Sequence, residues 1–529
     1  MPRPALPHRF SFLSPRGAAA QALRWWGPCL LAAAGCAPAQ YFQSDARLGA
    51  PAETAAGAPA RYTAGRQYAR PGVLHRVFFG KHHRSTWAAP VAAPVFDVAT
   101  AAPGGALRRV KLGGGFNSTS LGVVAADGRP YVLRTVDKDP RRALRGWLKN
   151  SPLAWYLRDN VSATHPYGAL AVPPLARAVG VPHTNPRLFY ARPADPALAG
   201  DSLAKLRGQL VWLEEKFSAD ARPTDAVPTA TALVGSEAFY KRLFADPRHR
   251  PDPAALLRAR LLDAWLGDWD RHAGQWTWAQ VPTPGAPTGR FFYQPVPKDR
   301  DMVFYRAADG VFPWLFTRRF AMRKWNTFRP TYYDLKGLLQ QGHYLDEHGL
   351  ISLTAGQFQA AAAAMQGQLT DAAIDSALHR LPPAAYALEG PYLAGALRQR
   401  RADLPHVAAV LYRRLSRRPT VGGTAQAERF VVRRFADSTT VAVYAPALGP
   451  DSLLLARTFS ARETKVVTLE GLEGADVFEV TEVGSRATRG PHLAIYGNPA
   501  ARPPAPGRGM RYFTVPRRGA HAYSHPAEE

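Results

Sequence analysis

Apolar and polar residues alternate in several short stretches of the first half of the chain. Such alternation is typical of half-buried β-strands, and turn-forming residues separate the stretches. An Ala-Asp-Gly turn at 126–128 joins two of them into a hairpin. The predicted strands are 108–112, 121–125, 130–136, 187–191, 209–217, 275–280 and 290–295.

Helical periodicity is more frequent farther along the chain. Thr354 and Gln357 form a capping-box pattern, which predicts a helix over 355–368. From residue 428 onward period two returns, which predicts a β-rich C-terminal module. Further helices are predicted at 142–157, 169–179, 371–381, 392–401 and 404–415.

Length and charge limit the functional classes. The 529 residues are too many for one core, so we expect two or three domains. The net charge of +27 indicates either a solvated basic surface or an anionic partner such as lipid headgroups. No nucleic-acid partner is expected, because no zinc-finger, ribonucleoprotein or helix-turn-helix signature accompanies the charge.

The N-terminus predicts the compartment. The apolar run 25–34 follows Arg16 and Arg24 and is shorter than the roughly 20 residues that span a bilayer. It ends in Ala-Gly-Cys, which predicts a lipoprotein signal over 1–36 with Cys36 as the lipidation site. An ordinary cleaved signal peptide with a structural Cys36 is the alternative. Residues 37–68, rich in Ala, Gly and Pro, are predicted to be a flexible tether.

Candidate chemistry is concentrated around a predicted hairpin. Gly267 and Asp268 end an apolar helical run, so the next residues should form a loop that presents Asp270, Arg271 and His272. Two more carboxylates, Asp299 and Asp301, directly follow the second strand of the hairpin. Phosphoryl-transfer enzymes hold their base and metal ligands in such loops.

This order of loop Asp, amide, hairpin and Asp-bearing loop resembles the catalytic centre shared by CotH-type, HipA-type and phosphoinositide kinases. The segment PKDRDMVF at 297–304 is most similar to the CotH type. The resemblance implies that Asp270 is the base, and that Arg271 and His272 support its loop. It also implies ATP or another nucleotide with Mg²⁺ or Mn²⁺. The implied metal-binding residues are Gln275, which replaces the family's Asn, Asp299 and Asp301.

A glycine-rich turn with the sequence GGGFNSTS lies at 113–120, between two predicted strands. Backbone N–H groups of such a turn can cradle phosphates. Arg134 stands where the kinase pattern has Lys, and no Glu begins the next predicted helix to pair with it. The predicted nucleotide-binding residues are Gly113, Gly114, Gly115, Ser118, Thr119, Arg134 and Lys138.

Segments between residues 68 and 483 also resemble a family of envelope proteins from Gram-negative bacteria. In longer relatives these segments are joined to calcineurin-like phosphoesterase or BamA-like barrel regions. The two resemblances imply an α+β, two-lobed protein-kinase-like fold: a β-rich N-lobe at 69–217, a helical C-lobe at 218–424 and the small β-rich module at 425–529. The expected location is the cell envelope, lipid-anchored at the outer membrane and facing the periplasm.

Three functions remain open at this point. An active kinase would transfer phosphate to a protein or glycan hydroxyl in the envelope. A catalytically inactive pseudokinase-like scaffold would bind a partner or an anionic glycan. Phosphoester hydrolysis is a third reading, although it would need two metals within about 4 Å.

Other charged residues are predicted to lie at the surface. Adjacent residues on an extended stretch point to opposite faces, so His82 and His83 are not expected to bind one metal ion together. Both are expected to be exposed at the surface. Glu214 is expected to be solvated or ion-paired. Arg400 belongs to a basic helix face that is expected to be solvated.

Overall fold

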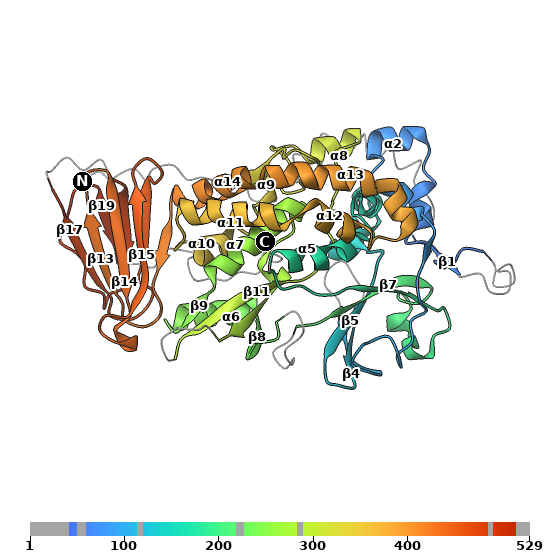
Figure 1. Ribbon diagram of the computed structural model, residues 1–529, viewed down its shortest axis with the longest axis horizontal. Helices are drawn as coiled ribbons and strands as arrows, with labels where there is room; N and C mark the ends of the chain where they lie inside the picture. The colour runs from blue at the N-terminus through green and yellow to red at the C-terminus, as the bar shows by residue number, and fades with distance from the viewer. Residues whose placement is uncertain are drawn as a thin grey trace.

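The computed structural model describes residues 42–49, 60–113, 120–217, 227–282, 289–484 and 490–514. The protein is a mixed α+β fold, which confirms that part of the prediction. Figure 1 shows a pair of twisted sheets at one end, a layer of helices along the molecule and two further sheets beneath these helices. No helix among these described residues is long and apolar enough to cross a membrane.

A five-stranded sheet forms the part that follows the N-terminal segment. Its order is β3-β4-β5-β7-β6, with every neighbouring pair antiparallel. Along β5, Tyr131 and Leu133 are buried in the sheet's own core, so Val132 and Arg134 lie on the opposite face, as alternation predicts. The strands are β3 (Leu107–Gly113), β4 (Ser120–Ala125), β5 (Pro130–Thr135), β6 (Arg187–Ala191) and β7 (Gln209–Glu215).

The predicted helix over 142–157 is wrong in its first half. Short 3-10 turns occupy that region, because Gly146 adopts a left-handed φ of 49° that interrupts a helix. The α-helix begins only at Pro152, where Ser151 accepts a hydrogen bond from Ala154 N as the N-cap. The elements between β5 and β7 are η2 (Pro140–Ala143), η3 (Gly146–Asn150), α4 (Pro152–Asp159), η4 (Asn160–Ala163), η5 (Gly168–Ala171), α5 (Val172–Ala178), η6 (Pro196–Leu198) and η7 (Asp201–Leu203).

The central part is built around α7 (Pro253–Leu266), which is buried on nearly every side. Asp252 caps its first turn, and Gly267 ends it in the left-handed conformation at φ 73°, as the sequence predicts. The predicted hairpin is present and belongs to a sheet of order β8-β10-β11-β9. The remaining elements are β8 (Ala232–Gly235), α6 (Ser236–Ala245), β9 (His249–Pro251), η8 (Ala273–Gln275), β10 (Trp276–Val281) and β11 (Phe291–Pro297).

Helices that follow this sheet cover α7. The capping box of Thr354 and Gln357 is confirmed, with both reciprocal hydrogen bonds formed at the start of α11. Arg400 corrects the prediction of a solvated basic face, because it is buried and donates to the backbone carbonyls of Trp265 and Ala264. The helices are α8 (Val311–Phe316), α9 (Leu335–Leu338), α10 (His343–Gly349), α11 (Ala355–Gln368), α12 (Asp371–Leu378), α13 (Pro383–Ala402) and α14 (Leu404–Ser416).

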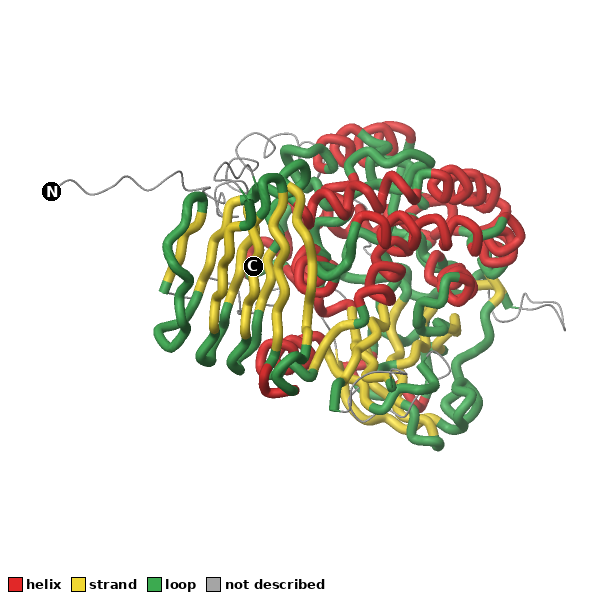
Figure 2. The backbone as a smooth tube through the Cα atoms, turned by 60° about the vertical axis from the view of Figure 1, so that its left-hand side comes forward, coloured by secondary structure: helices red, strands yellow, loops and turns green. Residues whose placement is uncertain are grey.

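Two four-stranded sheets form the C-terminal end of the molecule, with orders β12-β16-β18-β19 and β15-β14-β13-β17. Figure 2 shows these strands beside the helical layer. Inward side chains of both sheets, such as Phe430, Val441 and Ile495, form a core of their own. The elements are β12 (Thr420–Gly422), β13 (Arg429–Arg434), β14 (Ser438–Tyr444), η9 (Pro446–Leu448), β15 (Leu453–Ser460), β16 (Val466–Glu470), β17 (Val477–Glu482), β18 (His492–Tyr496) and β19 (Met510–Phe513).

At α3 (Arg84–Ala88) the N-terminal segment packs against α13 instead of running along the surface. His82 and His83 are therefore buried, with exposed fractions of 6% and 1%, and the prediction that they are exposed is wrong. Their rings do point to different neighbours, His82 to Ser162 and His83 to Glu389. The segment contains β1 (Arg61–Tyr62), η1 (Arg66–Ala69), α2 (Val73–Phe79), α3 (Arg84–Ala88) and β2 (Val91–Ala92).

Candidate functional site

A cavity of about 340 Å³ lies between the chain that follows β5 and the loops at the end of the central hairpin. This volume is within the range of small-molecule sites. Charged side chains from both sides reach it, namely Lys138, Asp270, Asp301 and Lys324. Aromatic side chains form much of the remaining wall; they are Trp87, Trp212, Trp269, Tyr305 and Trp325.

The end of β11 directs two carboxylates toward the five-stranded sheet. Asp299 follows the strand with a left-handed φ of 57°, a conformation that is uncommon for residues other than Gly and that Asp tolerates. Its Oδ1 accepts a hydrogen bond of 2.8 Å from Arg134 Nη1 and lies 3.7 Å from Lys138 Nζ. Lys138 also forms an ion pair with Asp301. The predicted phosphate-binding cations and the predicted metal ligands thus lie side by side.

Glu214 completes this group and was not predicted as part of the site. It lies on β7 directly across from Val132, which shares a face with Arg134, and it pairs with the Arg134 guanidinium. The Thr184 hydroxyl also donates to it. Once β5 and β7 are known to be neighbours, cross-strand register identifies this partner. We call Arg134, Lys138, Glu214, Asp299 and Asp301 the outer cluster.

Asp270 and Gln275 lie beside the outer cluster. Asp270 lines the cavity and accepts a hydrogen bond of 3.4 Å from the Gln341 amide. The Gln275 side chain helps to lower the pKa of Asp299, so the longer amide still acts on the carboxylate to which the resemblance assigns a metal. Its backbone carbonyl accepts from Lys298 N at 3.0 Å, which ties the two loops together.

Arg271 points away from the cavity, into a buried set of charges. Its guanidinium donates to the backbone carbonyls of Lys298 at 2.9 Å and Gln275 at 3.2 Å, so it fixes the two loops to each other. It also lies 3.3 Å from Asp263 and 3.5 Å from Asp268. We call this set the inner cluster; its members are Arg260, Asp263, Asp268, Arg271, Arg300 and Asp346.

Neighbouring residues along the loops belong to different clusters. Asp299 and Asp301 join the outer cluster, whereas Arg300 between them turns inward and pairs with Asp263 and Asp268. The left-handed conformation of Asp299 and the turn that begins at Asp301 give this division, and not the alternation of a regular strand.

His272 caps the short η8 turn. Its Nδ1 accepts a hydrogen bond of 3.1 Å from Gly274 N, which fits a supporting role in the loop. Of the glycine turn, Gly113 is the last residue of β3, and Gly114, Gly115, Ser118 and Thr119 lie outside the described residues. Cys36 lies outside them as well.

Burial and charge act on the outer cluster in opposite directions. Burial raises the pKa of Asp299, but the charges of Arg134 and Lys138 outweigh it and hold that pKa well below its usual range. For Lys138, burial lowers the pKa, and the charge of Asp299 offsets this only in part. The Asp299 carboxylate is therefore ionised at neutral pH.

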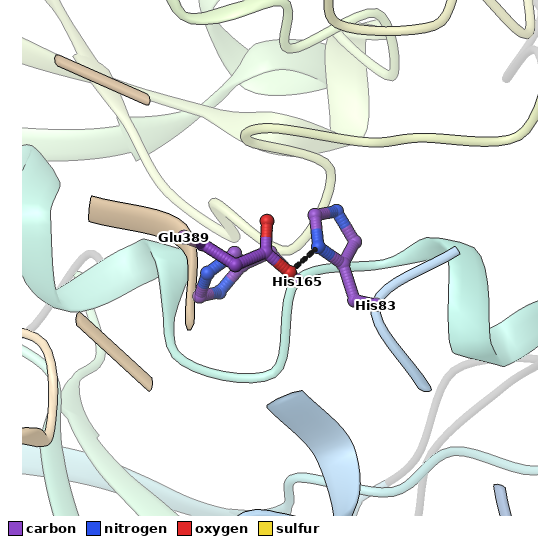
Figure 3. A group of neighbouring side chains, drawn as sticks. All are labelled: His83, His165 and Glu389. Atoms are coloured by element: carbon purple, nitrogen blue, oxygen red, sulfur yellow. Dashed lines mark hydrogen bonds and ion pairs between the residues drawn. The ribbon is translucent and has the colours of Figure 1, made fainter. Parts of the chain in front are cut away.

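A separate group of titratable side chains contains His83, His165 and Glu389. Among the described residues it is the one group of three or more His, Cys, Asp or Glu whose ligand atoms all lie within 4.8 Å of one another. Figure 3 shows the Glu389 carboxylate pointing at His83, with a 2.6 Å contact from Nδ1 to Oε1. The other ring nitrogen of His83 lies 2.8 Å from the Phe304 carbonyl and must carry a proton.

The hydrogen bonds of Glu389 favour a structural role for this group. Its Oε1 also accepts from the Thr86 hydroxyl at 2.6 Å, and Arg306 lies 3.1 Å from its other oxygen. The positively charged guanidinium would oppose a metal ion at this position. We interpret the group as an anchor that joins α13 to the N-terminal segment.

Comparisons with known proteins place few limits on this site. No family model matches the chain, and no curated protein matches it. Among solved structures, the chain has a weak likeness to the Helicobacter pylori proinflammatory kinase CtkA, at 12% sequence identity and a TM-score of 0.31. That alignment covers 60% of this chain and 99% of the other.

Proposed function

We propose that this protein is a lipid-anchored envelope protein whose cavity binds ATP or another nucleotide with Mg²⁺ or Mn²⁺, and that it transfers phosphate to a protein or glycan hydroxyl. The observation that supports the proposal is that Arg134 and Lys138 form ion pairs with Asp299 and Asp301 beside a cavity that Lys138, Asp301 and Asp270 line. Phosphoryl transfer needs positioned cations, metal-binding carboxylates and a group that orients the acceptor.

Each residue has a role in this proposal. Arg134 and Lys138 would hold phosphate oxygens, and Asp270 would orient the acceptor hydroxyl and accept its proton. Mg²⁺ is commonly held by one or two protein carboxylates together with substrate phosphates, and Asp299 and Asp301 supply that number. When bound, the metal would neutralise charge that develops on the transferred phosphoryl group.

The ion pairs explain how the site would accept these ligands. Arg134 contacts both Glu214 and Asp299, so it can release Asp299 and keep one carboxylate partner. Lys138 likewise lies near both Asp299 and Asp301, so it can release one carboxylate and keep the other. Ligand binding would then exchange ion-pair partners without leaving a buried charge unpaired, which costs several kcal/mol.

The same ion pairs favour a second candidate, a catalytically inactive scaffold that binds a protein partner or an anionic glycan. Asp299 and Asp301 are already neutralised by protein cations. A site that is satisfied in this way is stable without metal or nucleotide.

Thermal unfolding of the full chain with Mg²⁺ or Mn²⁺ and ATP tests the proposal. We expect nucleotide with metal to raise Tm, and Asp299→Ala to abolish that rise. Asp371→Ala, which removes a carboxylate on the surface of α12, is the matched control and should keep it. Labelled phosphate should reach an envelope acceptor. Nucleotide binding without phosphate transfer would favour the inactive scaffold. No rise of Tm with any nucleotide would refute nucleotide binding by either an active or an inactive kinase-like site.

Lipid attachment is tested separately. Cys36→Ser should abolish labelling by a palmitate analogue, whereas Cys29→Ser, the chain's other Cys, should not. Continued labelling of Cys36→Ser would exclude this anchor.

A further inference from the structure

The outward side of α2 is apolar. Val73, Leu74, Val77 and Phe78 are 78%, 76%, 52% and 43% exposed, and their spacing places them on one side of the helix. The polar His75 turns inward instead, with its Nε2 3.2 Å from Asp159 Oδ1. A surface helix normally has the reverse arrangement.

Helix α8 and the chain after it extend this surface. The ring of Phe312 packs against those of Phe78 and Phe79, with centroids 5.8 and 5.1 Å apart, and Figure 1 shows α2 and α8 side by side at one edge of the molecule. Trp314 is 49% exposed and Phe320 is 77% exposed. We call the combined surface the α2–α8 face; its exposed apolar residues are Val73, Leu74, Val77, Phe78, Val311, Trp314, Phe320 and Met322.

The segments that form this face carry only positive charge. Residues 70–81 contain the exposed Arg70, Arg76 and Lys81 and no Asp or Glu, and residues 310–333 contain five Lys and Arg and none. Arg318 stacks over the ring of Trp314, with its guanidinium carbon 4.5 Å from the centroid. Of the nearby carboxylates, Asp159 pairs with Arg84 and Asp334 with Arg323, while Asp309, directly before the second segment, accepts a hydrogen bond from His82 N.

The combination of exposed apolar side chains and positive charge on the α2–α8 face indicates the kind of partner that it fits. Exposed apolar patches usually mark an interaction site, and Trp, Phe and Leu surrounded by Arg and Lys are typical of surfaces that lie in the headgroup region of a bilayer. A second copy of the chain fits less well, because a two-fold interface would bring identical positive charges together. Anionic lipid headgroups instead complement the charge.

We propose that the α2–α8 face docks on an anionic bilayer surface. The apolar side chains of α2 and α8 enter the boundary between headgroups and acyl chains, and the surrounding Arg and Lys contact lipid phosphates. The inference depends neither on the nucleotide chemistry nor on Cys36, so it can succeed or fail independently of the proposed function.

A fluorescent probe at a single cysteine tests this face directly. Because Cys29 and Cys36 are the only cysteines, the full chain with both changed to Ser offers a cysteine-free background without the lipid. An environment-sensitive fluorophore is attached at Val77→Cys. The matched control is Leu453→Cys, since Leu453 is 42% exposed on the C-terminal sheets, at the far end of the molecule from α2.

With vesicles rich in phosphatidylglycerol, the Val77 probe should shift to the blue and be quenched by brominated acyl chains, while the Leu453 probe should not change. Neutral phosphatidylcholine vesicles or high salt should weaken the signal. Equal responses at both positions, or none at Val77, would overturn the proposal. So would a Val77 probe already blue-shifted without vesicles, because another part of the protein or a second copy would then cover the face.

A second measurement excludes an effect of the label. Leu74→Ser with Phe320→Ser removes two exposed side chains, so Tm should be unchanged while the vesicle partition coefficient falls roughly tenfold. Leu453→Ser should alter neither quantity. Unchanged partitioning of the double variant would contradict docking through this face.

Discussion

The inner and outer clusters are built from the same types of charged side chain but differ in their exposure. The inner cluster has three carboxylates and three guanidiniums, and Arg260, Asp263 and Arg271 are at most 1% exposed. The outer cluster adjoins a cavity, and the side chains of Asp299 and Lys138 are 27% and 21% exposed. A closed set of matched charges can only hold the fold together, whereas a set that borders a cavity can exchange partners with a ligand.

The local backbone course of each loop places its residues in one cluster or the other. Asp268 and Arg271 face inward, while Asp270 between them lines the cavity. The same chain segment therefore contributes to both structure and candidate chemistry. Four substitutions separate the two contributions.

The largest effect should come from Asp263→Asn. This carboxylate contacts Arg260, Arg271 and Arg300, and its loss leaves three buried guanidiniums with only two carboxylates, Asp268 and Asp346. We expect the free energy of unfolding to fall by about 3–5 kcal/mol, measured by urea denaturation at pH 7. A loss below about 1 kcal/mol would mean that the inner cluster is not the structural unit that we describe.

A smaller effect is expected from Asp299→Asn. Arg134 keeps Glu214 and Lys138 keeps Asp301, so the free energy of unfolding should fall by only about 1–2 kcal/mol. Metal-dependent nucleotide binding should nevertheless be lost, because the substitution removes a carboxylate that would hold the cation. Isothermal calorimetry with ATP and Mg²⁺ measures this; retained affinity would exclude Asp299 as a ligand.

Much of the fold follows from local pattern. Alternation predicts the five strands of the β3–β7 sheet and the β10–β11 hairpin, and the capping box at Thr354 predicts the start of α11. The order of Asp270, Asp299 and Asp301 also predicts that loop residues come together. These features depend on neighbours in sequence or on one hairpin.

Long-range packing decides the features that the sequence does not reveal. Glu214 becomes the partner of Arg134 only because β7 lies next to β5. The burial of His83 depends on α13, which supplies Glu389 from 306 positions away. Composition also cannot show which side of α2 faces outward, because the apolar residues of that helix are expected to be buried.

Asp476 differs from the carboxylates of the inner and outer clusters, because its neighbour is another carboxyl and not a cation. It is fully buried beside Glu428, and burial raises its pKa to about 7. The folded protein therefore binds this proton more tightly than the unfolded chain, whose Asp titrates near 4. This contribution to stability is present at low pH and is lost as pH rises through about 7.

Tm should accordingly decrease between about pH 5 and 8, and Asp476→Asn should flatten that decrease. Differential scanning calorimetry at constant ionic strength measures both. In the inner cluster burial also raises the pKa of Asp268, so the difference between the parent and Asp476→Asn isolates the contribution of Asp476. A parent protein whose Tm rises with pH over this range would contradict the assignment.

The smallest effect on stability should come from Asp270→Asn. The substitution keeps the size of the side chain and affects one 3.4 Å hydrogen bond from Gln341 at the cavity wall, so the free energy of unfolding should change by less than about 0.5 kcal/mol. Nucleotide and metal affinity should also persist, since Asp270 would act on the acceptor. Only labelled-phosphate transfer should fall, by about 10²-fold or more.

Because Asp270 and Asp268 are two residues apart but belong to different clusters, Asp268→Asn is the matched control: it should reduce stability strongly while Asp270→Asn does not. Equal losses of stability in the two variants would show that the clusters are not separate, and full transfer by Asp270→Asn would remove Asp270 as the base.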